Sequence, residues 1–89
     1  MLVLPTDLTR TQASACLQML VQGLRAEQGV TVVIDAAALG RFDSAALAVL
    51  LEFRRESLAL GKSLVIRAMP QRLTDLASLY GIADLLPAG

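Results

Sequence analysis

The 89-residue sequence predicts a small α/β domain with a mostly parallel sheet covered by helices. Two observations support this fold class. Short apolar, β-branched runs alternate with longer segments whose apolar residues recur at helical spacing, and a glycine follows each helical segment. Such alternation favours parallel strands joined by right-handed helical crossovers. The length suits one core, so we expect a single domain over residues 1–89 and a sheet of three or four strands.

The first half of the chain predicts a strand, a helix and a second strand. Leu2–Leu4 is a short β signal that Pro5 ends, and Gly29 is expected to end the helix that follows. Val30–Ile34 is apolar at four of five positions, which suits a central strand buried on both faces. Asp35 marks its carboxyl end, and residues 36–41 form a short connection. The predicted apolar face of the first helix consists of Ala13, Cys16, Leu17, Leu20, Val21 and Leu24.

The second half repeats this order. A helix is expected from Ser44 to about Leu60, where Gly61 stops it, and a strand at residues 63–67 follows. Pro70 suits the first turn of a third helix, and Gly81 suits its C-terminal cap. Residues 84–86 read as a final turn before Pro87. The predicted apolar stripe of the third helix consists of Leu73, Leu76, Ala77 and Tyr80.

Composition argues against several classes of function. Eight basic and eight acidic residues give a formal net charge of zero, whereas nucleic-acid binding requires a basic face. The chain has no histidine and one cysteine, so a four-ligand zinc site and a histidine base are both excluded. We expect no metal and no cofactor. Cys16 suits a buried core position and a reducing cytoplasm, because it has no partner for an intrachain disulfide.

The hydropathy pattern points to a partner protein. The N-terminus lacks a basic start and a long apolar region, and no apolar run approaches the roughly 20 residues of a membrane span. We therefore expect no direct membrane insertion. Hydrophobic residues make up 55% of the chain and charged residues 18%, below the roughly 25% of typical soluble domains. So few charged residues on a small domain predict that another protein covers part of its apolar surface.

The segment from Phe42 to Leu51 is the most informative part of the sequence. Ser44 is expected to cap the second helix, and Asp43 adds a charge that the helix dipole favours. The seven residues Ala45–Leu51 are all apolar, although a surface helix needs only one apolar stripe. Either this helix is buried on every side or its outer face contacts a partner. The predicted partner-binding residues are Phe42, Asp43, Ser44, Ala45, Ala48 and Val49.

Other candidate residues have simpler interpretations. Asp35 and Asp43 at strand ends resemble a carboxylate pair, but we favour the simpler interpretation that Asp35 closes a turn and Asp43 aids a helix cap. Arg41, Arg54 and Arg55 read as a solvated basic face. Ser44 is either a plain cap or a recognition and phosphorylation point. Because no nucleophile, base and oxyanion donors occur together, we do not expect an enzyme.

The ordered motifs of the chain resemble those of the STAS domain family. They are Val32-Val33-Ile34-Asp35, then Phe42-Asp43-Ser44-Ala45-Ala46-Leu47, then Gly61-Lys62-Ser63-Leu64-Val65-Ile66. Members of this family usually carry aspartate, serine or threonine, a small residue, glycine or alanine, and leucine at positions 43–47. The resemblance extends from about Leu2 to Leu86 and implies a STAS fold that acts through protein–protein contacts.

Two branches of the family imply different partners. One is the small cytoplasmic STAS subunit of the Mla-type phospholipid ABC transporter, which binds the transporter's ATPase at the inner face of the inner membrane. The other comprises anti-sigma factor antagonists, whose partner is a kinase-type anti-sigma factor that phosphorylates the serine at the position of Ser44. The C-terminal run from Leu76 to Pro87, with Leu79-Tyr80 before its turn, is more similar to the transporter subunits. A small enzyme or nucleotide-binding protein is the third class, disfavoured by the missing catalytic set.

Overall fold

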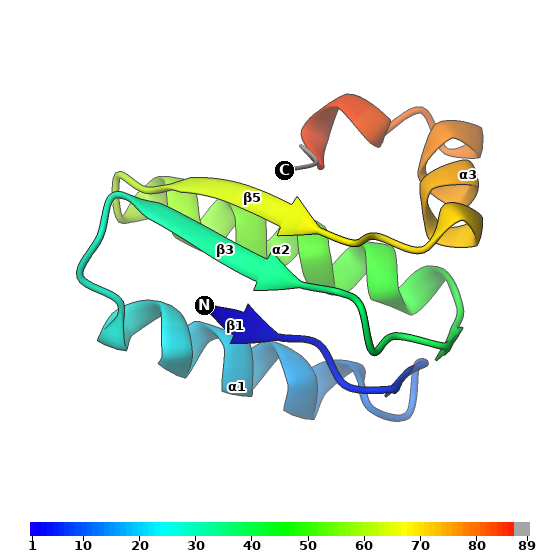
Figure 1. The fold of residues 1–89 in the computed structure, drawn as a ribbon, viewed down its shortest axis with the longest axis horizontal. Helices are drawn as coiled ribbons and strands as arrows, with labels where there is room; N and C mark the ends of the chain where they lie inside the picture. The colour runs from blue at the N-terminus through cyan, green and yellow to red at the C-terminus, as the bar shows by residue number, and fades with distance from the viewer. Residues whose placement is uncertain (87–89) are drawn as a thin grey trace.

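The computed structural model describes residues 1–86 as two small parallel sheets, three α-helices and a final 3₁₀ turn (Figure 1). The elements in chain order are β1 (Leu2–Val3), β2 (Asp7–Leu8), α1 (Ala13–Ala26), β3 (Thr31–Asp35), β4 (Arg41–Phe42), α2 (Ser44–Ala59), β5 (Ser63–Arg67), α3 (Gln71–Leu79) and η1 (Ala83–Leu85). The predicted α/β class, the three helices and the last turn are confirmed. Pro87 lies outside the described residues.

The main sheet has the strand order β1-β3-β5, and both of its strand pairs are parallel. The register places Val32 opposite Leu64 and Ile34 opposite Ile66, so the buried side chains of β3 and β5 lie on the same face. The pair β2-β4 forms a separate parallel sheet. The sequence analysis missed β2 and β4 because a strand of two residues carries no alternating pattern.

Only one face of the main sheet is covered by helices, and this corrects the expectation that β3 is buried on both faces. Val32 and Ile34 are fully buried, whereas Val33 is half-buried and Thr31 is exposed. The physical reason is the handedness of the crossovers. Both connections advance in the same direction, from β1 to β3 to β5, so right-handed crossovers place α1 and α2 on the same side (Figure 1).

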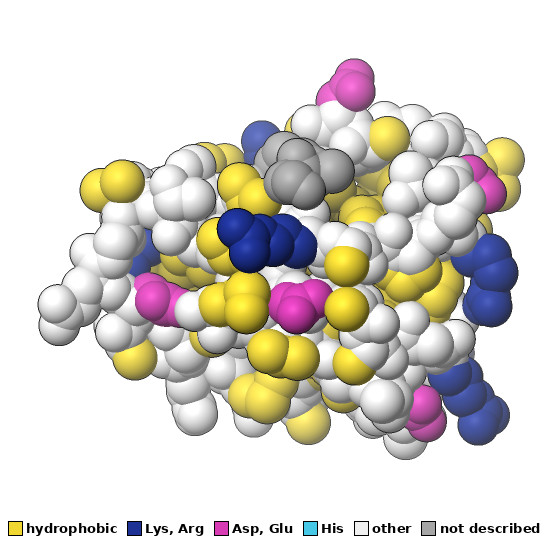
Figure 2. Space-filling view, in the orientation of Figure 1, with side chains coloured by type: hydrophobic (Ala, Val, Ile, Leu, Met, Phe, Trp, Pro, Cys, Tyr) yellow, Lys and Arg dark blue, Asp and Glu magenta, His cyan; other side chains and the backbone are white. Residues whose placement is uncertain are grey.

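The open face of the sheet carries a mixture of apolar and charged side chains. The positions that alternate with the buried ones are Val3, Val33, Val65, Asp35 and Arg67, of which Val3 is 52% exposed. Figure 2 views this face and shows hydrophobic side chains around a basic and an acidic side chain. The alternation explains why β3, whose three central residues are apolar, leaves a partly polar surface.

The core lies between the main sheet and the helices. Cys16, Leu20 and Leu24 of α1 are buried in one cluster with Val32 and Ile34, as the helical spacing predicts. Gly23 lets β1 lie close to α1, because a Cβ at this position would come within 2.5 Å of Leu2 Cδ2.

Helix α2 is apolar around most of its circumference because three neighbours surround it. It contacts α1, β5 and α3. Ala48 is exposed and Ala45 half-buried, so the unbroken apolar run reflects burial on several sides and leaves only a narrow outer strip. The Ser57 hydroxyl is also buried and donates to the Phe53 carbonyl oxygen at 2.8 Å. The buried residues of α2 are Ala46, Leu47, Val49, Leu50, Phe53 and Ser57.

Glycine ends two of the three α-helices, as expected. Gly61 and Gly81 have φ angles of 71° and 72°, a region that costs other residues more. In each case the next residue closes a Schellman motif. The Lys62 N–H donates to the Ser57 carbonyl at 2.9 Å, and the Ile82 N–H donates to the Ala77 carbonyl at 2.9 Å.

Three local expectations are wrong. Helix α1 ends at Ala26, and its C-terminal cap is Glu27 in an extended conformation, so Gly29 does not end the helix. The Glu27 N–H donates to the carbonyl oxygens of Gly23 and Leu24. These bonds satisfy carbonyl groups of the last turn without a residue in the left-handed conformation. The expected strand begins at Val30, but β3 begins one residue later, and the Val30 side chain is 77% exposed. Tyr80 is 56% exposed because α3 buries only a short face, which Leu73 and Ala77 occupy.

Replacing Leu20 should test the assignment of the core face. Its side chain is 1% exposed, so Leu20→Ala should lower the free energy of unfolding by about 2–5 kcal/mol through lost burial and a residual cavity. Met19→Ala, at a neighbouring residue that is 50% exposed, is the control and should change stability by less than about 0.5 kcal/mol. Urea titration measures both, and equal losses would contradict the core assignment.

The burial of Cys16 should make stability depend on alkaline pH. Desolvation raises the pKa of the Cys16 thiol in the folded chain. As pH rises, the Cys16 thiol therefore ionises in the unfolded chain before it ionises in the folded chain. The buried neutral thiol contributes its full stabilisation at neutral pH, and this stabilisation is lost as pH rises above about 8.5. Urea titrations between about pH 7.5 and 10 should show a smaller loss for Cys16→Ala than for the unmodified chain. If both proteins lose the same free energy of unfolding over this pH range, the Cys16 thiol is not the source of the pH dependence.

Candidate partner-binding site

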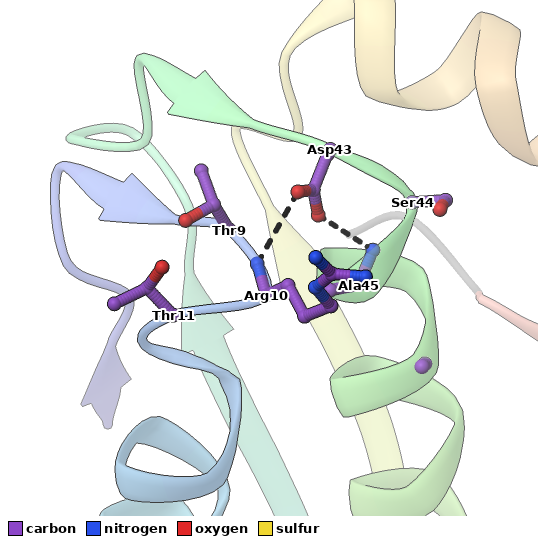
Figure 3. A pocket seen from close by; sticks show the side chains of 7 residues that line it. Thr9, Arg10, Thr11, Asp43, Ser44 and Ala45 are labelled. Carbon is purple, nitrogen blue, oxygen red and sulfur yellow. Dashed lines mark hydrogen bonds between the residues drawn. The ribbon is translucent and has the colours of Figure 1, made fainter.

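The N-terminus of α2 is held by the carboxylate of Asp43. This residue is the N-cap, with extended backbone angles, and its Oδ1 accepts from the Ala45 N–H at 2.8 Å. Its Oδ2 accepts from the Arg10 N–H at 3.2 Å, which ties the loop before α1 to α2 (Figure 3). The prediction that Ser44 is the cap is therefore wrong by one residue. Aspartate caps as well as serine does, and the extended conformation falls at Asp43.

Ser44 is consequently the first residue of the helix. Its side chain is exposed, and Figure 3 shows the hydroxyl pointing away from the Asp43 carboxylate, with no hydrogen bond to the other residues drawn. The helix start thus does not depend on this hydroxyl. A side chain at this position is available to a partner or a modifying enzyme without breaking the cap.

A shallow surface pocket of about 450 Å³ adjoins this helix start. Figure 3 shows the loop before α1 on one side of it and the first turn of α2 on the other. Both carboxylate hydrogen bonds of Asp43 lie at its edge, and small side chains from α2 form its wall. The lining residues are Thr9, Arg10, Thr11, Asp43, Ser44, Ala45 and Ala48.

The structure places five of the six predicted site residues at this corner of the surface. Asp43, Ser44 and Ala48 are exposed, and Phe42 and Ala45 are half-buried. Val49 differs, because its side chain is 3% exposed and belongs to the core. It supports the surface from below, and direct contact with a partner would require it to move.

Sequence reasoning missed the residues that other elements bring to the site. Thr9, Arg10 and Thr11 come from the loop before α1, and Arg72 comes from α3 with its Cζ 4.8 Å from the centroid of the Phe42 ring. The β2-β4 pair brings the loop to this place. Nothing in the spacing of these residues could have indicated that they meet.

The remaining candidates form no further site. Asp35 Oδ1 accepts from the Ala37 N–H at 2.9 Å and closes a turn, so Asp35 and Asp43 each have a local structural role. Arg54 lies about 15 Å along α2 from its start, which separates it from Arg41, and Arg55 pairs with Glu52. Within residues 1–86, no three His, Cys, Asp or Glu side chains form a potential metal site.

The parallel α/β layer, with α2 starting at the exposed Asp43-Ser44 corner, has the architecture of a STAS domain. The family model described as "Mlab, STAS domain" matches residues 1–87. The chain belongs to this family. Among curated proteins, none matches the chain. STAS domains generally act in protein interactions and not as catalysts.

Across the described part of the chain, no helix combines the length and apolarity that a membrane span requires.

Substitutions of Asp43 should separate its hydrogen bonds from its charge. Asp43→Ala removes the acceptor and should cost about 0.5–2 kcal/mol of stability. Asp43→Asn keeps the oxygen that caps Ala45 but removes the charge and the second oxygen, which accepts from the Arg10 N–H, so it should cost about 0.3–1 kcal/mol, and the part due to charge should shrink in high salt. Urea titrations at low and molar salt measure both. A loss for Asp43→Asn that is unchanged in molar salt would exclude dipole electrostatics as its source.

Proposed function

We propose that this chain is a cytoplasmic STAS subunit that binds and supports the ATPase of a phospholipid-transport ABC transporter at the inner face of the inner membrane. The observation that carries the proposal is the match of the Mlab family model to residues 1–87. The transporter branch implies that the serine or threonine at the helix start contacts the ATPase. Ser44 occupies that position here and is exposed.

The shape of the surface supports docking of a folded partner. Ser44, Ala45 and Ala48 have small side chains on the outer strip of α2, which allows a partner to approach the helix backbone closely. Phe42 adds a half-buried aromatic ring beside them. A small-residue strip beside an aromatic ring can exclude water when a matching surface covers it.

An anti-sigma factor antagonist is the alternative function, with Ser44 as its phosphorylation site. The exposed hydroxyl favours it, because a kinase could reach this oxygen without disturbing the Asp43 cap. A phosphate at this position would lie near the helix N-terminus, which favours negative charge, although Asp43 opposes it. Treatment with an anti-sigma kinase and ATP, followed by intact mass measurement, distinguishes the two. Stoichiometric phosphorylation of Ser44 would support the alternative.

The substitution Ser44→Glu should test the docking surface. A longer charged side chain must lose water on docking, so affinity for the ATPase subunit of the host's Mla-type transporter should fall by at least about 2 kcal/mol. The fold should tolerate the change, because a negative charge near a helix start is favourable. Titration calorimetry measures the affinity, and thermal melts of both proteins verify the fold.

Two controls separate this effect from general charge effects. Ser44→Ala keeps a small side chain and should bind within about threefold of the unmodified chain if packing dominates. Ser78→Glu adds the same charge at an exposed serine of α3 and should leave the affinity unchanged. If Ser44→Glu binds as tightly as the unmodified chain while remaining folded, this surface is not the docking site.

A further inference from the structure

Three arginines, from the loop before α1, from β4 and from α3, lie near the start of α2. The Arg10 N–H bonds to Asp43, Arg41 directly precedes Phe42, and Arg72 lies with its guanidinium over the Phe42 ring. We call Arg10, Arg41 and Arg72 the arginine rim. All three residues are exposed. In the described part of the chain, none of the three forms an ion pair with a carboxylate.

Among the described residues, the carboxylates near the rim form no ion pair with it. Asp43 accepts from two backbone N–H groups, and Asp75 Oδ1 accepts from Gln71 Nε2 at 2.9 Å. Asp7 is half-buried and lies opposite Arg41 in the β2-β4 register without pairing with it. The guanidinium groups of the rim therefore keep donors that point to solvent.

Arg10 is the rim residue that Figure 3 labels, and basic side chains gather at the same end of the molecule (Figure 2). Figure 2 shows basic side chains at the right-hand end, where α2 begins and α3 lies in Figure 1. Figure 3 shows the Arg10 side chain reaching from its loop toward the first turn of α2. Arg10 thus borders the small-residue strip of Ser44, Ala45 and Ala48, while Arg41 and Arg72 adjoin Phe42.

We propose that the arginine rim binds carboxylates on an acidic surface of the ATPase partner, while the small-residue strip packs against the centre of that surface. This inference rests on the proposed function and adds the chemistry of the partner. A guanidinium presents paired donors that match a carboxylate, and the Phe42 ring holds Arg72 in place for this contact. Exposed rim charges act mainly on association rate and partner choice.

An acidic protein surface fits these observations better than a polyanion does. Nucleic acid binding depends on many phosphate contacts, and the chain as a whole has a formal net charge of zero. The site also combines its charges with apolar groups, Phe42, Ala45 and Ala48, which suit a folded protein surface.

Neutral substitutions test the proposal. Arg10→Gln, Arg41→Gln and Arg72→Gln should each weaken binding to the purified ATPase subunit by about threefold to fivefold, the scale of an exposed ion pair. The triple variant should lose at least about tenfold and most of the salt dependence of binding between about 50 and 500 mM NaCl. Arg25→Gln is the matched control. It lies in the last turn of α1, about 20 Å along the helix from its start, and should bind normally.

The outcomes distinguish this inference from the proposed function. If Ser44→Glu weakens binding and the folded rim variants do not, the docking surface stands and the acidic-partner inference is overturned. If the unmodified chain does not bind the ATPase, both are overturned. Binding to phosphatidylglycerol vesicles that the triple variant loses would instead assign the rim to a lipid surface and would also overturn the inference. Thermal melts of each variant verify the fold.

Discussion

The enclosure of α2 determines most of the architecture. Its side chains meet β5 on one side and the helices α1 and α3 on others, so apolar residues occupy most of its circumference. The fully buried Phe53 ring and Leu50 side chain fill the space beneath the sheet. Because this helix is fixed on several sides, its N-terminus lies at a defined place on the surface. The candidate site depends on that position.

The Asp43 carboxylate connects this buried scaffold to the surface loops. One oxygen caps α2 through Ala45, and the other accepts from the backbone of Arg10. A single side chain therefore sets both the helix start and the neighbouring wall of the pocket. Ser44 bears none of this structural role, which leaves its side chain available for recognition. Asp43 thus makes the local structural contacts at this corner, and its neighbour Ser44 makes none of them.

The same crossover handedness that creates the core leaves the other sheet face uncovered. In a sheet that continued in both directions from its first strand, right-handed crossovers would place helices on both faces. Here the chain advances in one direction only, and β3 retains an open face with Val33 and Asp35. Part of the apolar surface of the domain therefore lies on this face, where Val3 is exposed, and another part lies on the strip along α2.

Local periodicity and backbone freedom, which are readable from the sequence, predict the order of the long elements, the buried face of α1 and the glycine ends of α2 and α3. The partner-binding site at Phe42, Asp43, Ser44, Ala45, Ala48 and Val49 stays a prediction of the sequence. Only the tertiary structure decided the one-sided sheet, the pairing of β2 with β4 and the burial of Val49, because these depend on how distant segments pack. The shift of the cap from Ser44 to Asp43 belongs to the same group, since either residue type can cap a helix and backbone geometry selects one. The arginine rim likewise arises from packing, because Arg10 and Arg72 are far apart in the sequence and reach the start of α2 from different segments.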